Sequence, residues 1–216
     1  MKSIYLTLII FCFLSCTKNK SVLLPEINHS KITEILDVSP AYIFYDNTKP
    51  DSLELNRKNL IITTNWLVNI DKRLTLKQVL PSIVLLQNKK RNAEMHKNED
   101  AKNYFTCNNT SIKNLGFIEF TDVIYQTEQL ALDYKNDSSN SNQTIITYSH
   151  GTVKIDKLVV GYSDVITTLN SLVKNKINLI LNFDKALKFQ DYISAKEKLQ
   201  ELKNPNITIN NNEFIY

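Results

Sequence analysis

The chain has little of the residue types from which many catalytic and cofactor sites are built. Its 216 residues include only three glycines, Gly116, Gly151 and Gly161, and these lie far apart. Phosphate-binding loops of the dinucleotide and P-loop kinds need clustered glycines, so both are excluded. The three histidines and three cysteines are also scattered, and no metal-ligand spacing is present. The composition therefore predicts a protein that is not an enzyme and that holds no metal and no cofactor.

Charge and hydrophobicity set broader limits. Twenty-six Lys and Arg against 22 Asp and Glu give a net charge of +4, with the two signs interleaved along the chain. This small and dispersed excess argues against nucleic-acid binding. Hydrophobic residues make up 43% of the chain and charged residues 22%, as in ordinary globular proteins. The length suits one mid-sized domain or two small ones.

The N-terminus has the pattern of an export signal. A basic start at Lys2 precedes an apolar run from Ile4 to Leu14, which is shorter than the ~20 residues that cross a bilayer. Ser15 directly before Cys16 resembles the lipobox of bacterial lipoproteins, in which the signal is cut before a lipid-modified cysteine. We therefore expect a signal peptide over 1–15 and lipidation at Cys16. Alternatives are an ordinary secretory signal and a buried N-terminal helix.

This interpretation leaves one cysteine in the mature chain. Cleavage before Cys16 removes Cys12, and the lipid occupies Cys16, so only Cys107 remains. An internal disulfide is then excluded, and Cys107 is expected to be a half-buried residue of a strand. The predicted location is the bacterial cell envelope, with the protein anchored by lipid on the periplasmic or outer-membrane side.

The first part of the chain contains few regular elements before residue 56. Residues 16–55 are predicted to be a tether with a short helix at Ser30–Leu36 and a strand at Ala41–Tyr45. After it, apolar and β-branched runs and helical periodicity predict further elements. These are strands at Asn59–Thr64 and Trp66–Lys72, a helix at Thr75–Leu86, a strand at Tyr104–Thr106 or Phe117–Phe120, and a helix at Phe120–Tyr134.

The same order of elements recurs in the last third. Predicted there are strands at Thr144–Tyr148 and Val153–Lys157, a helix over 165–173, a strand at Ile177–Phe183, a helix from Phe189 through Leu202, and strand material at 206–209 and 213–216. Ile61-Ile62-Thr63 echoes Ile145-Ile146-Thr147, and Val68–Lys72 echoes Val153–Lys157. This echo predicts a duplication.

The predicted fold class is therefore α+β, with two tandem small two-layer α/β domains. Each runs strand, strand, helix, strand, helix, and a C-terminal strand closes the last copy. The first domain spans 56–135 with an inserted polar loop at 88–103. An Asn- and Ser-rich linker spans 136–143, and the second domain spans 144–216.

The second copy resembles the periplasmic domain of the ExbD/TolR family of biopolymer-transport proteins. The resemblance rests on the stretch Leu179–Tyr192, where a strand runs into a loop with Asp184 and then an aromatic residue that opens a helix, and on Leu24-Pro25 near the N-terminus. It implies a non-catalytic binding or assembly component of an envelope transport system. The family's transmembrane aspartate has no counterpart, because no Asp or Glu precedes Glu26.

The alternative is a secreted or lipid-anchored enzyme of unknown substrate that uses His150 or Cys107. His150 stands beside Gly151 in an expected turn, while His29 and His96 fall in other loops, so no partner at catalytic spacing is visible. Turn chemistry therefore explains His150 more simply, and no sequence signature flanks Cys107.

Repeated carboxylates and aromatics give two further candidates. Asp71 with Asp156, and Asp122 with Asp191, hold matching places in the two copies and suggest paired carboxylates. A structural role at helix starts and turns explains each of them as well, and it is preferred. Trp66, Tyr148 and Tyr162 are candidate stacking platforms for a sugar or peptide, although strands also use aromatics for packing.

Sheet edges are the better candidates for function. An open edge of a two-layer α/β unit accepts an extended peptide by strand addition. We therefore expect a peptide segment of an envelope protein as partner, together with the membrane through the lipid. Pairing of the edge with the sister copy, or with a second chain in a homodimer, is the alternative.

Overall fold

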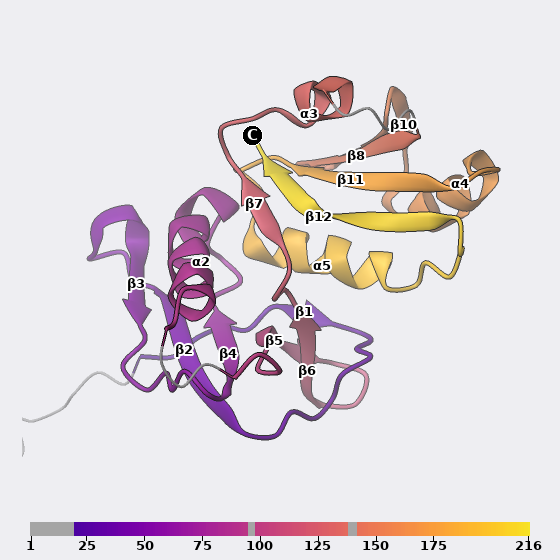
Figure 1. Cartoon of the computed structure of the whole chain (residues 1–216). Helices are drawn as coiled ribbons and strands as arrows, with labels where there is room; N and C mark the ends of the chain where they lie inside the picture. The colour runs from indigo at the N-terminus through magenta and orange to yellow at the C-terminus, as the bar shows by residue number, and fades with distance from the viewer. Residues whose placement is uncertain (1–19, 95–97, 138–141) are drawn as a thin grey trace, which may run out of the picture.

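A computed structural model describes residues 20–94, 98–137 and 142–216, which fold into two mixed sheets with four α-helices (Figure 1). The expected α+β class with two sheet-based units is confirmed. Cys16 lies outside the described residues, so its lipidation stays a prediction.

The first sheet holds the strands β1 to β6. Its order is β3, β2, β4, β5, with β6 on the far side of β5 and the short β1 beside the end of β5. The strands β2, β4 and β5 are mutually parallel, and β3 and β6 run antiparallel to their neighbours. Their bounds are β1 Glu26–Ile27, β2 Val38–Tyr45, β3 Leu53–Asn56, β4 Asn65–Ile70, β5 Asn103–Asn109 and β6 Asn114–Glu119, with α2 at Leu76–Arg91.

The second sheet has the order β10, β9, β8, β11, β12, β7. The four strands from β8 to β7 in this order are mutually parallel, and a hairpin of β9 and β10 extends the other edge. The bounds are β7 Ile124–Gln126, α3 Ala131–Asp137, β8 Gln143–Ser149, β9 Thr152–Ile155, β10 Leu158–Val160, α4 Val165–Leu172, β11 Ile177–Phe183, α5 Phe189–Leu199 and β12 Ile207–Ile215.

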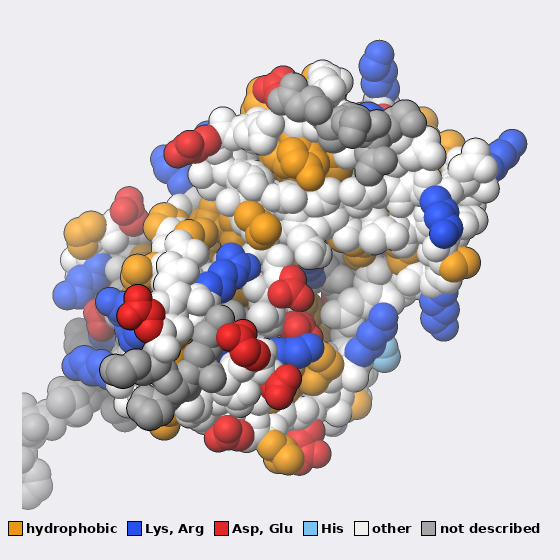
Figure 2. Space-filling model, in the orientation of Figure 1, with side chains coloured by type: hydrophobic (Ala, Val, Ile, Leu, Met, Phe, Trp, Pro, Cys, Tyr) orange, Lys and Arg blue, Asp and Glu red, His pale blue; other side chains and the backbone are white. Residues whose placement is uncertain are grey.

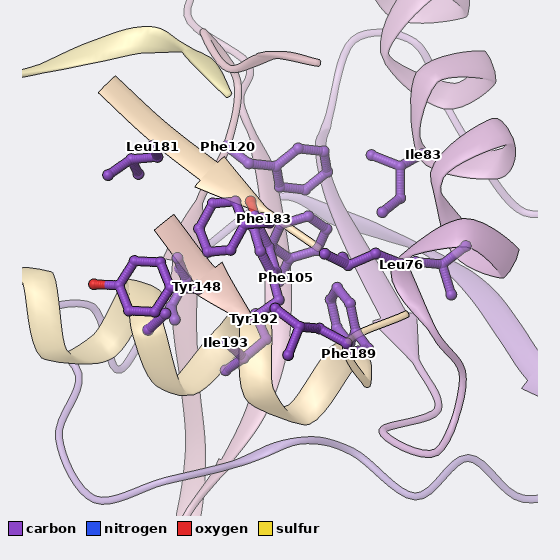
Figure 3. Close-up of a cluster of buried hydrophobic side chains, with 14 of the residues drawn as sticks. Leu76, Ile83, Phe105, Phe120, Tyr148, Leu181, Phe183, Phe189, Tyr192 and Ile193 are labelled. Carbon is purple, nitrogen blue, oxygen red and sulfur yellow. The ribbon is translucent and has the colours of Figure 1, made fainter. Parts of the chain in front are cut away.

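One hydrophobic core runs through both halves. Phe105 of β5 stacks on Phe120 with ring centroids 3.8 Å apart, and its edge meets Phe189 and Tyr192 of α5. Figure 3 shows these rings side by side with Phe183 of β11. A smaller cluster lies under α3 on the outer face of the second sheet. The helix α5 therefore lies between the second sheet and the first half (Figure 1).

The sequence explains β4 and α2 locally. Trp66, Val68 and Ile70 alternate with half-buried residues along β4, as one buried face of a strand requires. Thr75 then caps α2: its hydroxyl accepts from Gln78 N–H, and its own N–H donates to Gln78 Oε1 at 2.8 Å. This capping box fixes the start of the helix at Leu76, and Pro81 lies inside the helix.

An approximate two-fold relates the two halves at these helix starts. Leu76 N–H donates to Leu187 O at 2.9 Å, and Phe189 N–H donates to Leu74 O at 2.7 Å. The paired segments are Asn69-Ile70-Asp71-Lys72-Arg73-Leu74 and Asn182-Phe183-Asp184-Lys185-Ala186-Leu187, which share Asn, Asp, Lys and Leu at matching places. The structure thus equates β4 with β11 and α2 with α5.

The echoes read from the sequence point to a different alignment, which is wrong. Asn59–Thr64 forms turns and no strand, so it does not match β8. Ile61 explains why: its N–H donates to Ser39 Oγ, and its carbonyl accepts from the Trp66 indole at 2.7 Å. Side chains thereby replace the ladder partners of a strand. The strand that matches β8 is β2, which contains the expected strand Ala41–Tyr45.

Three other expectations also fail. The helix predicted at Ser30–Leu36 is absent, because Ser30 Oγ donates to Phe117 O and Ile32 pairs with Phe117 along β6. The helix predicted at Phe120–Tyr134 is replaced by β7 and α3, since Gln87 takes the carbonyls of Phe120 and Val123. Residues 38–45 and 53–56, assigned to the tether, are strands of the first sheet.

Candidate functional site

The two residues of the enzyme alternative lie on different sheets. Cys107 is fully buried on β5, and this burial raises the pKa of its thiol far above the usual range. His150 is exposed in the turn between β8 and β9. A thiol nucleophile needs an adjacent base and a lowered pKa. The geometry of these two residues provides neither.

The repeated aspartates serve the backbone and nearby cations. Asp71 is buried and accepts two bonds of 2.8 Å from the Arg73 guanidinium. Asp156 accepts from Lys135 Nζ at 2.9 Å and from Ile145 N–H. Asp122 follows β6 in a turn, and Asp191 opens α5. The structural counterpart of Asp71 is Asp184, which the sequence comparison of the two copies missed although the shared Asp-Lys pair marks it.

Tyr148, Tyr162 and Asp191 come together with His150 around one pocket, which we call the Tyr148 pocket. Its volume is about 450 Å³. The lining comes from the end of β8, the β8–β9 turn, the residues after β10 and the first turns of α5: Tyr148, Ser149, His150, Gly151, Thr152, Val153, Val160, Gly161, Tyr162, Leu187, Asp191 and Ser194. Trp66, the third aromatic candidate, is buried in the first half, where its indole N–H donates to Ile61 O, and it does not line this pocket.

The Tyr148 hydroxyl has no hydrogen-bond partner among the residues that the structure describes. The side chain is 4% exposed, and the oxygen itself is buried. Its ring stacks on Phe183 with centroids 5.2 Å apart, and Figure 3 shows the hydroxyl pointing away from the core cluster. Burial and the neighbouring Tyr162 raise the pKa of this hydroxyl, so it is protonated at physiological pH. An unpartnered buried hydroxyl costs free energy and calls for an explanation.

A second feature is the open edge of β12. The strand β7 pairs with β12 only at Asn212–Phe214, so no described strand covers residues 207–211 on that side. A groove of about 360 Å³ runs here between β12, α5 and the β6 region. Ile207 and Ile209 line it, and so does Gln200, whose buried Oε1 has no partner within the described part of the chain. We call this feature the β12 groove; the sequence predicted open edges but not which one.

Charge is spread over the visible face of the molecule. Figure 2 shows acidic and basic side chains mixed over the lower half of the view. At the right-hand end of the upper half the charged side chains are mainly Lys and Arg. Within residues 20–94, 98–137 and 142–216, no three His, Cys, Asp or Glu side chains are grouped as a metal site. In the same ranges, no helix is long and apolar enough to cross a membrane.

Comparisons with family models, with curated proteins and with solved structures found no match for this chain. The geometry of the Tyr148 pocket and the β12 groove is therefore the basis for assigning a role.

Proposed function

We propose that this protein is a non-catalytic binding or assembly component of a bacterial cell envelope, where it takes up an extended peptide segment of a protein partner at the β12 groove. The observation that carries the proposal is the uncovered edge at residues 207–211. A strand edge without a neighbour presents backbone N–H and C=O groups that an incoming chain pairs with.

The lining of the groove supports a peptide occupant. Half-buried Ile207 and Ile209 offer apolar contacts for alternate side chains of an added strand. Gln200 Oε1 offers a buried acceptor for an N–H of that strand. The hairpin edge at β10 is also exposed, with Leu158 48% and Val159 62% accessible. The Tyr148 pocket reaches this strand only at Val160, whereas the β12 groove is lined by two residues of the open edge itself, Ile207 and Ile209.

The order of elements supports the resemblance to the ExbD/TolR family. The chain from β8 to β12 runs strand, strand, strand, helix, strand, helix, strand, and without the short third strand β10 this is the order that the resemblance implies. We propose a lipid anchor at Cys16 for the same protein. Radiolabelled palmitate is expected to enter the wild-type chain and not Cys16→Ala, and labelling that persists in the variant would remove this part of the proposal.

The peptide site is tested by selecting extended peptides against the full chain and mapping them by hydrogen exchange. We expect amides within 207–211 to gain protection on binding, because new ladder bonds exclude water. Gln200→Leu is expected to weaken the binding of the selected peptides. Asn170→Leu, which also replaces an amide by leucine but at an exposed position of α4, serves as control. Protection at β10 instead, or unchanged affinity in Gln200→Leu, would contradict the proposal.

A further inference from the structure

The Tyr148 pocket lies apart from the β12 groove and has the features of a separate ligand site. Its volume of about 450 Å³ falls within the range of small-molecule pockets. Val153, Val160 and Leu187 give it apolar walls. The unpartnered Tyr148 hydroxyl, on a side chain only 4% exposed, lacks the partner that a bound ligand would supply.

The charge around the pocket is negative. Asp191 is the one carboxylate among the lining residues, which include no Lys or Arg. Its carboxylate accepts a hydrogen bond of 3.3 Å from Lys188 N–H, and no basic side chain in the described part of the chain pairs with it. Burial raises the pKa of Tyr162, and so do Glu197 and Asp191 of α5 and Glu201 just after it. These carboxylates thus act on the Tyr162 hydroxyl.

The first half shows that the fold does not require such a pocket. Ile43 takes the place of Tyr148, since Asp71 N–H bonds Ile43 O as Asp184 N–H bonds Tyr148 O. Gln78 takes the place of Asp191 in the capping box, and its Nε2 donates to Asp51 O at 2.6 Å. In the first half an apolar side chain therefore stands where Tyr148 stands in the second. An amide bonded to a loop stands where Asp191 does. Asp191 keeps the capping role by accepting from Lys188 N–H, but no described loop is bonded to it as Asp51 is to Gln78, and the Tyr148 hydroxyl has no described partner.

We propose that the Tyr148 pocket binds a primary alkylammonium group. The aliphatic stem lies against Val153, Val160 and Leu187, and the ammonium donates to the Tyr148 hydroxyl within the field of Asp191. Tyr148 and Asp191 line the same pocket of about 450 Å³, so we place one ammonium between them. The exposed ring of Tyr162 adds a cation–π surface. A lysine side chain of a protein and a free alkylamine share this chemistry.

Titration of the full chain, with tyrosine ring signals followed by NMR, tests the proposal. N-acetyl-lysine methylamide and n-pentylammonium are the two cationic probes, and N-acetyl-norleucine methylamide is the neutral analogue of the first. We expect the lysine probe to bind at least tenfold more tightly than the norleucine probe. Binding of the lysine probe alone identifies a protein side chain as the natural source, and equal binding of pentylammonium identifies a free amine.

Two variants complete the test. Tyr148→Phe and Asp191→Asn are each expected to weaken the cationic probes about tenfold, because each removes one group that meets the ammonium. Tyr42→Phe in the first half is the control and should leave binding unchanged. The thermal unfolding temperature of Tyr148→Phe should equal or exceed that of the wild type, since the lost hydroxyl has no described partner and its burial costs free energy. Equal binding of the norleucine probe, or unchanged affinity in both variants, would overturn the proposal.

Discussion

In the first half, β5 has β6 beside it along Tyr104–Asn109, whereas β12, which holds the same place in the second sheet, has β7 beside it only at Asn212–Phe214. The first half also fills with Ile43 and Gln78 the place that the second half leaves open beside Tyr148 and Asp191. Two halves with the same framework therefore differ in how they are closed. The second half leaves uncovered a strand edge and a pocket whose counterparts in the first half are filled.

The largest expected effect comes from the shared core. Phe105→Ala removes the ring that stacks on Phe120 and meets α5, and we expect it to lower the free energy of unfolding by about 3–5 kcal/mol. Because this core joins both halves, they should still unfold in one transition by chemical denaturation. Phe214→Ala, in the smaller cluster under α3, is the matched variant with a smaller expected loss. Separate transitions in wild type would contradict the shared core.

The equivalent aspartates Asp71 and Asp184 should differ in how much they stabilise the fold. Asp71 is fully buried and forms an ion pair with the half-exposed Arg73. The Asp184 carboxylate accepts a hydrogen bond from Ala186 N–H. Asp71→Asn should lower the free energy of unfolding by about 1–3 kcal/mol, because it leaves a buried hydrogen-bond network incomplete. Asp184→Asn should cost less than ~1 kcal/mol. Equal losses in denaturant titrations would remove this distinction.

The same pair predicts an acid dependence. Burial by itself raises the pKa of Asp71, but hydrogen bonds from Arg73 and from Leu23 N–H outweigh it and lower the pKa below 3.8. The stabilising contribution is thus present above pH 3.8 and is lost as the pH falls through the folded-state pKa. Unfolding curves of Asp71→Asn should lose this part of the acid dependence, and curves parallel to wild type would argue against it.

A buried lysine gives an effect that is confined to alkaline pH. Lys90 is 5% exposed, and burial lowers its pKa from 10.5 to about 8 although Nζ donates to Thr64 O and Lys102 O. The unfolded chain binds more protons between these values, so the free energy of unfolding should rise from pH 8 to 10.5. Lys90→Met should abolish this rise, and the exposed Lys203→Met is the control. A rise that survives in Lys90→Met would exclude Lys90 as its source.

The sequence predicted the elements whose residues carry their own pattern. The sequence predicted β4 from the alternation of Trp66, Val68 and Ile70 and α2 from helical periodicity, whereas the Thr75–Gln78 capping box was recognised only in the structure. Prediction from the sequence failed where a distant group takes the backbone bonds: Gln87 withdraws the carbonyls of Phe120 and Val123 from the predicted helix. Of the pocket, Tyr148, Tyr162, His150 and Asp191 were candidates, but nothing in their spacing brought them together.

By itself the sequence determined the α+β class and the low content of catalytic residue types. These follow from local periodicity and composition, which do not depend on distant contacts. Only the tertiary structure decided which edge stays open and which hydroxyl stays unpartnered. Both depend on what the rest of the chain leaves uncovered, because strand partners and hydrogen-bond partners are brought together from segments far apart in the sequence.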